Sequence, residues 1–197
     1  MKVCFFCASS EALEPKFYSI AKTFGESIVE KNWELVTGGS NVGLMKTLAQ
    51  TVKSSGGRSI GIIPKMFDDK NLTCLDNTEI IFTKDMQERK KMLFDVSDAF
   101  VILPGGFGTL DEMLEIITLK QLGQYKKAIV IYNQDGFYDN MLKQFNVIFE
   151  SNFAKPQNKN VYVVTQNVEE TLNYIENYQE VEIDSYWFDV TKDAFEE

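Results

Sequence analysis

The chain has 197 residues, of which 44% are hydrophobic and 25% charged, an ordinary composition for one globular α/β domain. Its formal net charge of −9 argues against nucleic acid and anionic membranes as partners. There is no histidine, which excludes Ser-His-Asp and Cys-His catalysis and zinc sites built on imidazole. Acid–base chemistry must therefore depend on carboxylates, lysine, tyrosine, cysteine or water.

Cysteine content and hydropathy predict a cytoplasmic protein. Three cysteines in a chain of this length are typical of a reducing compartment, and no apolar run approaches the roughly 20 residues of a membrane-spanning helix. We also expect no secretory signal, because the apolar stretch at residues 3–8 is too short. Cys4 and Cys7 form a C-x-x-C motif, but both fall in a predicted strand, which favours core packing over redox chemistry.

Apolar strand-like runs alternate with helical patterns along the chain. Strands are expected at residues 2–7, 33–37, 58–63, 79–82, 99–103, 128–132 and 161–165, and helices at residues 15–31, 44–53, 86–96, 110–122, 136–150 and 168–178. Residues 65–78 predict a polar loop over the sheet edge. The alternation predicts a single Rossmann-like, doubly wound parallel β-sheet flanked by helices, in one domain at residues 1–179. Residues 180–197 form an acidic, aromatic tail, which we expect to dock on the domain or on a partner chain.

Small polar residues follow the first strand, and a glycine turn follows the second. Ser9 and Ser10 stand at the carboxyl end of a strand, where open α/β sheets bind ligands, although a turn and helix cap would explain them equally well. Residues 38–43 have the Gly-x-x-x-x-Gly spacing of a P-loop. Leu44 and Met45 replace its lysine and Ser/Thr, so we do not expect an ATPase or a GTPase; a tight turn without a ligand is the alternative.

The most informative stretch is Leu103-Pro104-Gly105-Gly106-Phe107-Gly108-Thr109-Leu110-Asp111-Glu112, where a buried strand turns into a helix. Its glycines allow close approach of a ligand, and Thr109 is the expected helix N-cap. A helix N-terminus with bare glycine backbone is suited to an anion, phosphate above all. Asp111 and Glu112, expected in the first helical turn, either complement the helix dipole or lie beside a bound phosphate ester.

These glycines do not form the usual dinucleotide fingerprint. Asp111 occupies the position of the third glycine after Gly106 and Gly108, and the turn after the first strand has no glycine. An NAD-dependent dehydrogenase is therefore disfavoured. Two glycine turns at the ends of different strands fit one phosphate and a sugar better than a pyrophosphate.

A capping box is expected where the fourth predicted strand leads into a helix. Asp85 is the expected N-cap, and Glu88 is expected to reach back to it. Arg89 and Lys90 follow in the first turns, where cations oppose the helix dipole. Either ligand binding or a solvated run of charge would explain these two residues.

Together these motifs resemble those of the lonely guy family. Residues 104–112 resemble its PGGxGTxxE signature, residues 85–90 its second motif and residues 38–45 its glycine turn, in the family's order. The resemblance covers residues 3–178. Such proteins are Rossmann-like, dimeric or larger cytokinin riboside 5′-monophosphate phosphoribohydrolases. They cleave the N-glycosidic bond of N6-modified AMP, and often of AMP as an AMP nucleosidase does, into free base and ribose 5-phosphate.

By position, the resemblance implies that Arg89 and Glu112 are catalytic and that no cofactor or metal is needed. The implied substrate contacts are Lys90, Gly105, Gly106, Phe107, Gly108, Thr109, Leu110, Asp111 and Thr118. The turns after the first two strands add Ser10, Gly39 and Met45 to the expected contacts. Two positions depart from the family's pattern: Asn71 stands where a glutamate is common, and Lys46 stands where glycine is usual.

Glu112 is expected to stabilise an oxocarbenium-like transition state and to orient or deprotonate water. Arg89 is expected to bind phosphate or a ribose hydroxyl, or to hold Glu112 ionised. Asp111 and water are both candidates for protonating the leaving base. Two rival functions are a non-catalytic nucleotide sensor and a pyridoxal phosphate-dependent decarboxylase, for which no lysine has a recognisable context.

Apolar residues on two helices predict a homodimer or a larger homo-oligomer. The stripe expected to face the sheet is Leu110, Met113, Leu114 and Ile117. The residues left over for a partner face are Leu93, Phe94, Ile116 and Leu119. With no lid evident in the sequence, we expect a two-fold partner to complete the site near Arg89 and Glu112.

Overall fold

The computed structural model describes residues 1–68 and 70–181, and within them seven strands form one sheet in the order β4-β3-β2-β1-β5-β6-β7. The strands are β1 (Lys2–Phe6), β2 (Glu34–Thr37), β3 (Arg58–Pro64), β4 (Glu79–Thr83), β5 (Ala99–Ile102), β6 (Ala128–Tyr132) and β7 (Val163–Thr165). Every pairing between these strands is parallel, which confirms the predicted doubly wound α/β fold. Residues 182–197 of the predicted tail lie outside the described residues.

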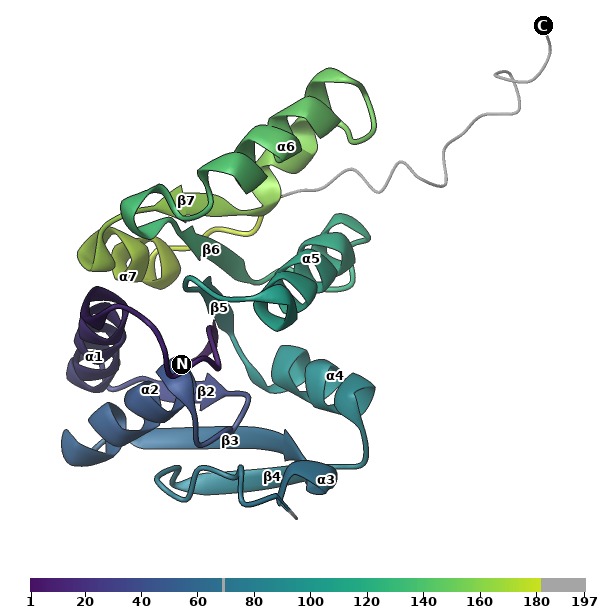
Figure 1. Ribbon diagram of the computed structural model, residues 1–197. Helices are drawn as coiled ribbons and strands as arrows, with labels where there is room; N and C mark the ends of the chain where they lie inside the picture. Colours follow the sequence, from purple (N-terminus) through teal and green to yellow (C-terminus); the bar gives the residue numbers. More distant parts are fainter. Residues whose placement is uncertain (69, 182–197) are drawn as a thin grey trace, which may run out of the picture.

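Helices cover both faces of the sheet (Figure 1). One face carries α1 (Pro15–Glu30), α2 (Gly43–Ser54) and α7 (Val168–Glu176), and the other carries α4 (Met86–Val96), α5 (Phe107–Gln121) and α6 (Asp139–Glu150). The short helices are α3 (Lys65–Asp68), η1 (Gln134–Gly136) and η2 (Pro156–Val161). Because η1 and η2 occupy part of the expected ranges, α6 and β7 begin later than predicted. No helix in the described parts of the chain is both long and apolar enough to cross a membrane.

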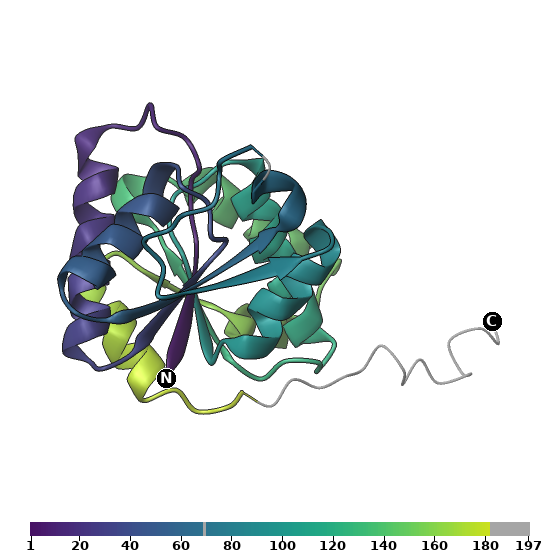
Figure 2. The ribbon, with the colours of Figure 1, turned by 90° about the horizontal axis from the view of Figure 1, so that it is seen from below.

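The strands of the sheet are twisted relative to one another (Figure 2). Their side chains alternate between two apolar layers. Phe5 and Cys7 belong to the layer under α1, α2 and α7, whereas Cys4 and Phe6 belong to the layer under α4, α5 and α6. Both cysteines are free and buried. The prediction that the C-x-x-C motif packs in the core is therefore confirmed.

The strand order reverses between β1 and β5. The chain builds outward from β1 to β4 and then returns to pair β5 with the other side of β1. At such a switch point, the connections that follow the two strands leave toward opposite faces and open a crevice at their carboxyl ends. The Ala8 N–H donates to the Pro104 carbonyl over 3.3 Å and ties these two connections together.

The segment at residues 65–78, predicted as a polar loop over the sheet edge, connects β3 with the edge strand β4 and also reaches the turn after β2. It opens with α3 and then meets the turn after β2, where the Asn41 N–H donates to the Leu72 carbonyl (2.7 Å). The Cys74 N–H donates to the Gly39 carbonyl (2.8 Å), beside a bridge between Ser40 and Thr73. These backbone contacts hold a cover over the carboxyl ends of the strands.

Helix α5 begins at Phe107, earlier than predicted, and its N-cap is Gly106. The prediction of Thr109 as N-cap is therefore wrong, since Thr109 lies inside the first turn and is buried. Asp111 and Glu112 consequently fall in the second turn rather than the first. Glu112 is buried, although its polarity had placed it off the apolar stripe.

The predicted partner face is also wrong in most of its members. Leu93, Phe94 and Ile116 are buried in the core of their own chain, and Leu114, expected to face the sheet, is 42% exposed. The buried residues of α5 are Thr109, Glu112, Met113, Ile116, Ile117 and Lys120. Apolar periodicity could not identify this stripe, because half of its members are polar.

Candidate active site

A cavity of about 400 Å³ lies at the carboxyl ends of the strands, where their order reverses. We call it the central cavity. Its lining residues are Cys7, Ser9, Gly38, Ser40, Val42, Met45, Ile63, Phe67, Leu72, Met86, Arg89, Gly106, Phe107, Gly108, Thr109, Asp111 and Glu112. The volume is within the range of small-molecule sites.

The lining is divided between apolar and polar groups. Apolar side chains come from Met45, Ile63, Phe67, Leu72 and Met86. Of these, Phe67 and Leu72 belong to the covering segment, residues 65–78. Phe107 stands at the rim and is 92% exposed. The remaining lining includes hydroxyl, carboxylate and guanidinium groups. This arrangement suits a ligand with one apolar, planar end and one polar, charged end.

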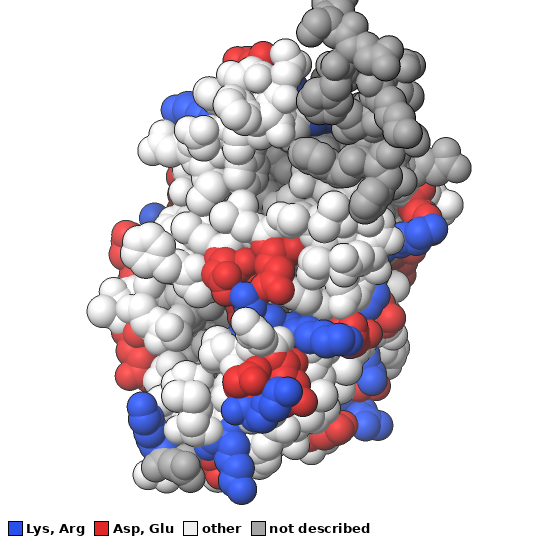
Figure 3. Space-filling view, turned by 90° about the vertical axis from the view of Figure 1, so that its right-hand side faces the viewer, with Lys and Arg blue, Asp and Glu red and all other residues white. Residues whose placement is uncertain are grey.

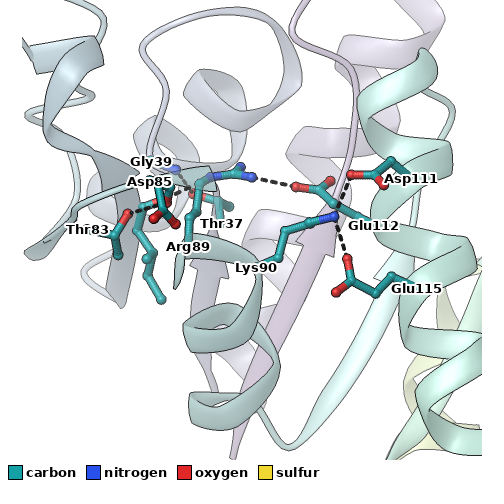
Figure 4. A network of polar contacts seen from close by, with 10 residues as sticks. Thr37, Gly39, Thr83, Asp85, Arg89, Lys90, Asp111, Glu112 and Glu115 are labelled. Atoms are coloured by element: carbon teal, nitrogen blue, oxygen red, sulfur yellow. Dashed lines mark hydrogen bonds and ion pairs between the residues drawn. The ribbon is translucent and has the colours of Figure 1, made fainter. Parts of the chain in front are cut away.

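A buried ion pair between Arg89 and Glu112 crosses the cavity (Figure 4). The Arg89 Nη1 donates to the Glu112 Oε1 over 2.8 Å, and the Nε donates to the Ile62 carbonyl over 3.1 Å. Each of the two side chains is only 10% exposed. Arg89 comes from α4 and Glu112 from α5, so the pair joins elements on the two sides of the switch point.

The predicted N-cap of α4 sets the position of Arg89. The Asp85 side chain accepts from the Glu88 N–H over 2.8 Å, which confirms Asp85 as N-cap. The Glu88 carboxylate does reach back, but it accepts from the Lys84 N–H (2.7 Å), one residue before the N-cap. Arg89 therefore leaves a fixed first turn, and its guanidinium is not part of a solvated run of charge.

Burial dominates the electrostatics of Glu112. It raises the pKa of this carboxyl, while the Arg89 guanidinium acts in the opposite direction by charge and by hydrogen bond. Burial also raises the pKa of the Cys7 thiol, with the negative charge of Glu112 adding to the effect. A neutral thiol thus faces the carboxylate. A carboxyl with a raised pKa and one cationic partner in a cavity is typical of a functional site.

The N-terminus of α5 opens into the same cavity. The first N–H groups of a helix have no partner within it, and the N-cap Gly106 provides no side-chain bond. A Cβ added to Gly106 or Gly108 would meet nothing within 4 Å, and neither residue has a positive φ. The packing of the described chain therefore does not require glycine at either place, whereas close approach of an anion to the backbone does.

Two other glycines are required by packing. A Cβ on Gly38 would lie 1.7 Å from the Arg89 Nη2, so the bare backbone makes room for the guanidinium. A Cβ on Gly105 would lie 2.1 Å from the Thr109 Oγ1. These glycines shape the site, while Gly106 and Gly108 leave space within it.

Lys90 belongs to a second site on the surface. Its Nζ pairs with Asp111 (2.9 Å) and with Glu115 (2.5 Å) and lies in a groove of about 890 Å³ between α4 and α5, the α4–α5 groove. Thr118 also lines this groove, and Asp111 lines both the groove and the central cavity. Figure 3 shows acidic and basic side chains gathered on this face. The structure thus separates Lys90 and Thr118 from the other predicted substrate contacts.

The central cavity receives most, but not all, of the remaining predicted residues. Met45, Gly106, Phe107, Gly108, Thr109, Asp111, Arg89 and Glu112 line it. Ser10, Gly39, Gly105 and Leu110 do not line it. In the first two turns the lining residue is the one immediately before, Ser9 or Gly38, because the Ser10 hydroxyl accepts from the Ala12 N–H (3.2 Å) and Gly39 packs against the Gly61 backbone.

Sequence reasoning found Met45 and Phe107 but missed other apolar lining residues, Ile63, Phe67, Leu72 and Met86. Phe67 and Leu72 flank Asn71, which has a left-handed backbone (φ 57°) and does not itself line the cavity. Only the backbone bonds between the covering segment and the β2 turn bring these side chains to the site. Met86 could have been suspected, since it directly follows the predicted N-cap Asp85 and precedes Arg89.

The switch-point cavity and the helix N-terminus beside it define a Rossmann-like α/β protein with a candidate site for a small ligand. The family described as "Possible lysine decarboxylase" matches residues 45–175. Cytokinin riboside 5′-monophosphate phosphoribohydrolase LOG5 of Arabidopsis thaliana is 36% identical over 180 residues, which cover 91% of this chain and 79% of LOG5. The probable phosphoribohydrolase LOGL6 of Oryza sativa subsp. japonica is 36% identical, covering 90% of this chain and 71% of that protein. The chain belongs to this family, the lonely guy family.

Solved structures of lower identity share the fold. A molybdenum cofactor binding protein from Rippkaea orientalis superposes with a TM-score of 0.67 at 24% identity, covering 89% of this chain and 94% of that chain. The molybdenum cofactor carrier protein from Chlamydomonas reinhardtii gives a TM-score of 0.68 at 17% identity, covering 89% and 95%. At these identities the likeness concerns the Rossmann-type fold alone.

Gly38→Ala should displace the Arg89 guanidinium, because the new Cβ would occupy its place. Leaving Glu112 buried without its partner should lower the free energy of unfolding by about 3 kcal/mol, measured by urea denaturation. Gly106→Ala is the matched control, since its Cβ meets no atom within 4 Å. Equal stability of the two variants would contradict this account of Gly38.

Proposed function

We propose that this protein hydrolyses the N-glycosidic bond of purine nucleoside 5′-monophosphates, AMP and N6-modified AMP, to free base and ribose 5-phosphate. The carrying observation is that the buried Arg89–Glu112 pair faces the same cavity as the uncapped N-terminus of α5. The cavity thereby combines a site for an anionic group with a carboxylate one helical turn away. The names of the family's curated relatives support this reaction and this substrate class.

The 5′-phosphate binds, in this proposal, at the start of α5. Its oxygens accept hydrogen bonds from N–H groups of residues 106–109, and the helix dipole favours their negative charge. Gly106 and Gly108 let the phosphate approach the backbone closely. Fixing the phosphate also fixes the ribose relative to Glu112, which lies one helical turn further on.

Glu112 is the proposed catalytic carboxylate. Departure of the base leaves positive charge on the ribose, and a carboxylate beside that carbon stabilises the charge and orients or deprotonates water. Arg89 is the second proposed catalytic residue. It holds Glu112 ionised and in place, and it can contact a ribose hydroxyl from the same cavity. A guanidinium keeps its protons, so protonation of the leaving base falls to Asp111 or to water.

The base lies, in this proposal, among the apolar side chains of the central cavity. Met45, Phe67, Leu72 and Met86 offer an apolar surface to a planar ring and to an apolar substituent on its N6 atom. The covering segment that carries Phe67 and Leu72 limits access of bulk water.

We propose the cytoplasm as the compartment, since all three cysteines are free.

A pyridoxal phosphate-dependent decarboxylase, the function named in the family's description, does not fit this site. Such enzymes hold the cofactor on a lysine through a Schiff base. Among the described residues that line the central cavity, none is a lysine. Lys90 is held instead by Asp111 and Glu115 in the α4–α5 groove.

Glu112→Gln should keep the fold and lose base release. The amide preserves the shape and one acceptor for Arg89, but it neither stabilises the ribose cation nor takes a proton, so kcat should fall by at least about 100-fold. Adenine release from AMP, followed by chromatography, measures the effect. Glu26→Gln, at an exposed position on α1 away from the cavity and the α4–α5 groove, is the matched control and should stay near wild type. Saturable AMP binding by the wild type without base release would instead indicate a nucleotide sensor.

The activity should decline on the acid side as Glu112 takes up its proton. Because burial raises the pKa of this carboxyl, the decline should occur at a higher pH than for an exposed glutamate. Arg89→Met removes the group that lowers the pKa of Glu112 most, so the acid-side decline of kcat/KM should move to a still higher pH. Lys90→Met should shift it less, since Lys90 affects the pKa of Glu112 more weakly. Coincident profiles for the two variants would contradict this assignment.

Gly108→Ala should stabilise helix α5 while weakening the binding of AMP. Alanine favours the helix by about 0.5–1 kcal/mol and meets no atom of the protein, so the free energy of unfolding should rise. If the phosphate packs on this backbone, the KM for AMP should increase several-fold. Unfolding in urea and initial-rate kinetics measure the two effects. An unchanged KM would place the phosphate elsewhere.

We further propose a homodimer or larger assembly formed through the α4–α5 groove. Two of the predicted contacts outside the central cavity, Lys90 and Thr118, lie in this groove beside the exposed Leu114. Leu114→Asp should therefore lower the apparent mass in sedimentation velocity at micromolar concentration and reduce turnover. Leu75→Asp, at a more exposed site away from the groove, is the control. A monomeric wild type with full activity would contradict the proposal.

A further inference from the structure

Tyr138 lies just before α6 and is almost fully buried. Its hydroxyl donates to the Leu103 carbonyl over 2.8 Å. Leu103 is the residue from which the glycine turn of the site begins, yet Tyr138 does not line the central cavity. A polar group from the β6–α6 connection thus reaches the base of the proposed phosphate-binding turn from behind.

The Gly105 backbone also acts on this hydroxyl. Burial raises the pKa of Tyr138, and the Gly105 backbone acts in the opposite direction. The acceptor of the hydroxyl, the Leu103 carbonyl, is a backbone group two residues before Gly105. The hydrogen bond therefore helps to fix the path of the chain into the turn.

Tyr138 is itself held rigidly. Its N–H donates to the Asn133 Oδ1 over 2.7 Å, and the Asn133 Nδ2 donates to the Asp139 Oδ1 over 2.8 Å. The Asn133 N–H donates to the Thr165 carbonyl (2.8 Å), at the end of β7. The position of the hydroxyl is thereby tied to the carboxyl ends of β6 and β7.

Strand β1 holds the glycine turn from the other side. The Leu103 N–H donates to the Phe6 carbonyl (2.9 Å), and the Ala8 N–H donates to the Pro104 carbonyl (3.3 Å). Thr109 packs so closely on Gly105 that no Cβ fits there. Between these supports, the direction of the N–H groups at the start of α5 depends on where residues 103–105 are placed.

We propose that Tyr138 is a positioning residue for phosphate recognition. Its hydroxyl fixes residues 103–105 so that the N–H groups of the uncapped α5 N-terminus converge on the 5′-phosphate. The inference rests on the proposed function, in which this turn binds the phosphate of a nucleoside monophosphate. The β6–α6 connection, which carries Tyr138, thereby contributes to ligand binding although it does not contact the ligand.

Tyr138→Phe tests the proposal, because it keeps the ring and removes only the hydroxyl. The dissociation constant of ribose 5-phosphate, measured by calorimetry, and the KM for AMP should both rise about tenfold. The kcat should stay within about twofold, and the affinity for adenosine, which lacks the phosphate, should not change. Tyr132→Phe is the matched control, since Tyr132 is equally buried and its hydroxyl donates to the Gln166 carbonyl over 3.1 Å.

The outcomes separate this inference from the proposed function. If the wild type releases base and Tyr138→Phe binds ribose 5-phosphate as tightly as Tyr132→Phe does, the positioning role is wrong and the proposed function stands. If the wild type binds ribose 5-phosphate but releases no base, the proposed function is wrong and the binding comparison still decides the role of Tyr138. An equal loss of affinity for adenosine and ribose 5-phosphate would show general damage and overturn the inference.

A second variant serves if Tyr138→Phe does not fold. Asn133→Ala keeps the tyrosine but removes the acceptor for its N–H. Its affinity for ribose 5-phosphate should fall in the same direction, with adenosine binding unchanged. Unchanged affinity for ribose 5-phosphate would overturn the inference.

Discussion

The ion pair between Arg89 and Glu112 is the interaction on which the site depends. Both charges are withdrawn from water, and the desolvation of such a pair costs about as much free energy as the attraction returns. The pair is therefore a weak source of stability. Its value lies in placing a carboxyl group in a cavity where burial raises its pKa and Arg89 opposes that rise.

The surrounding structure makes this pair possible. Gly38 leaves the space that the guanidinium occupies, and the Ile62 carbonyl accepts the Arg89 Nε–H. The N-cap Asp85 fixes the turn from which Arg89 leaves. These groups come from β2, β3 and α4, so elements distant in the sequence converge on one side chain.

Helix α5 serves the core and the site at once. Met113, Ile116 and Ile117 pack under the sheet, while Thr109 and Glu112 from the same buried stripe face the cavity. A polar residue on a buried stripe is costly unless it is paired, and Glu112 is paired with Arg89. Because Glu112 stands on the same packed helix as these core residues, no loop separates the carboxylate from the core, and its position is fixed.

The sequence by itself determined the parallel α/β fold and the capped start of α4. These features depend on local signals, namely alternating strand and helix periods and an Asp-x-x-Glu cap. Arg89 and Glu112 are singled out by the resemblance to the lonely guy family, because local signals left a solvated charge run and a helix-dipole role open for them. Tertiary structure alone decided which stripe of α5 is buried, because Thr109, Glu112 and Lys120 are polar and hide the apolar period. It also decided that Lys90 and Thr118 lie outside the central cavity, and that Phe67 and Leu72 cover it. Those positions depend on hydrogen bonds and packing between distant segments, which no local pattern of residues records.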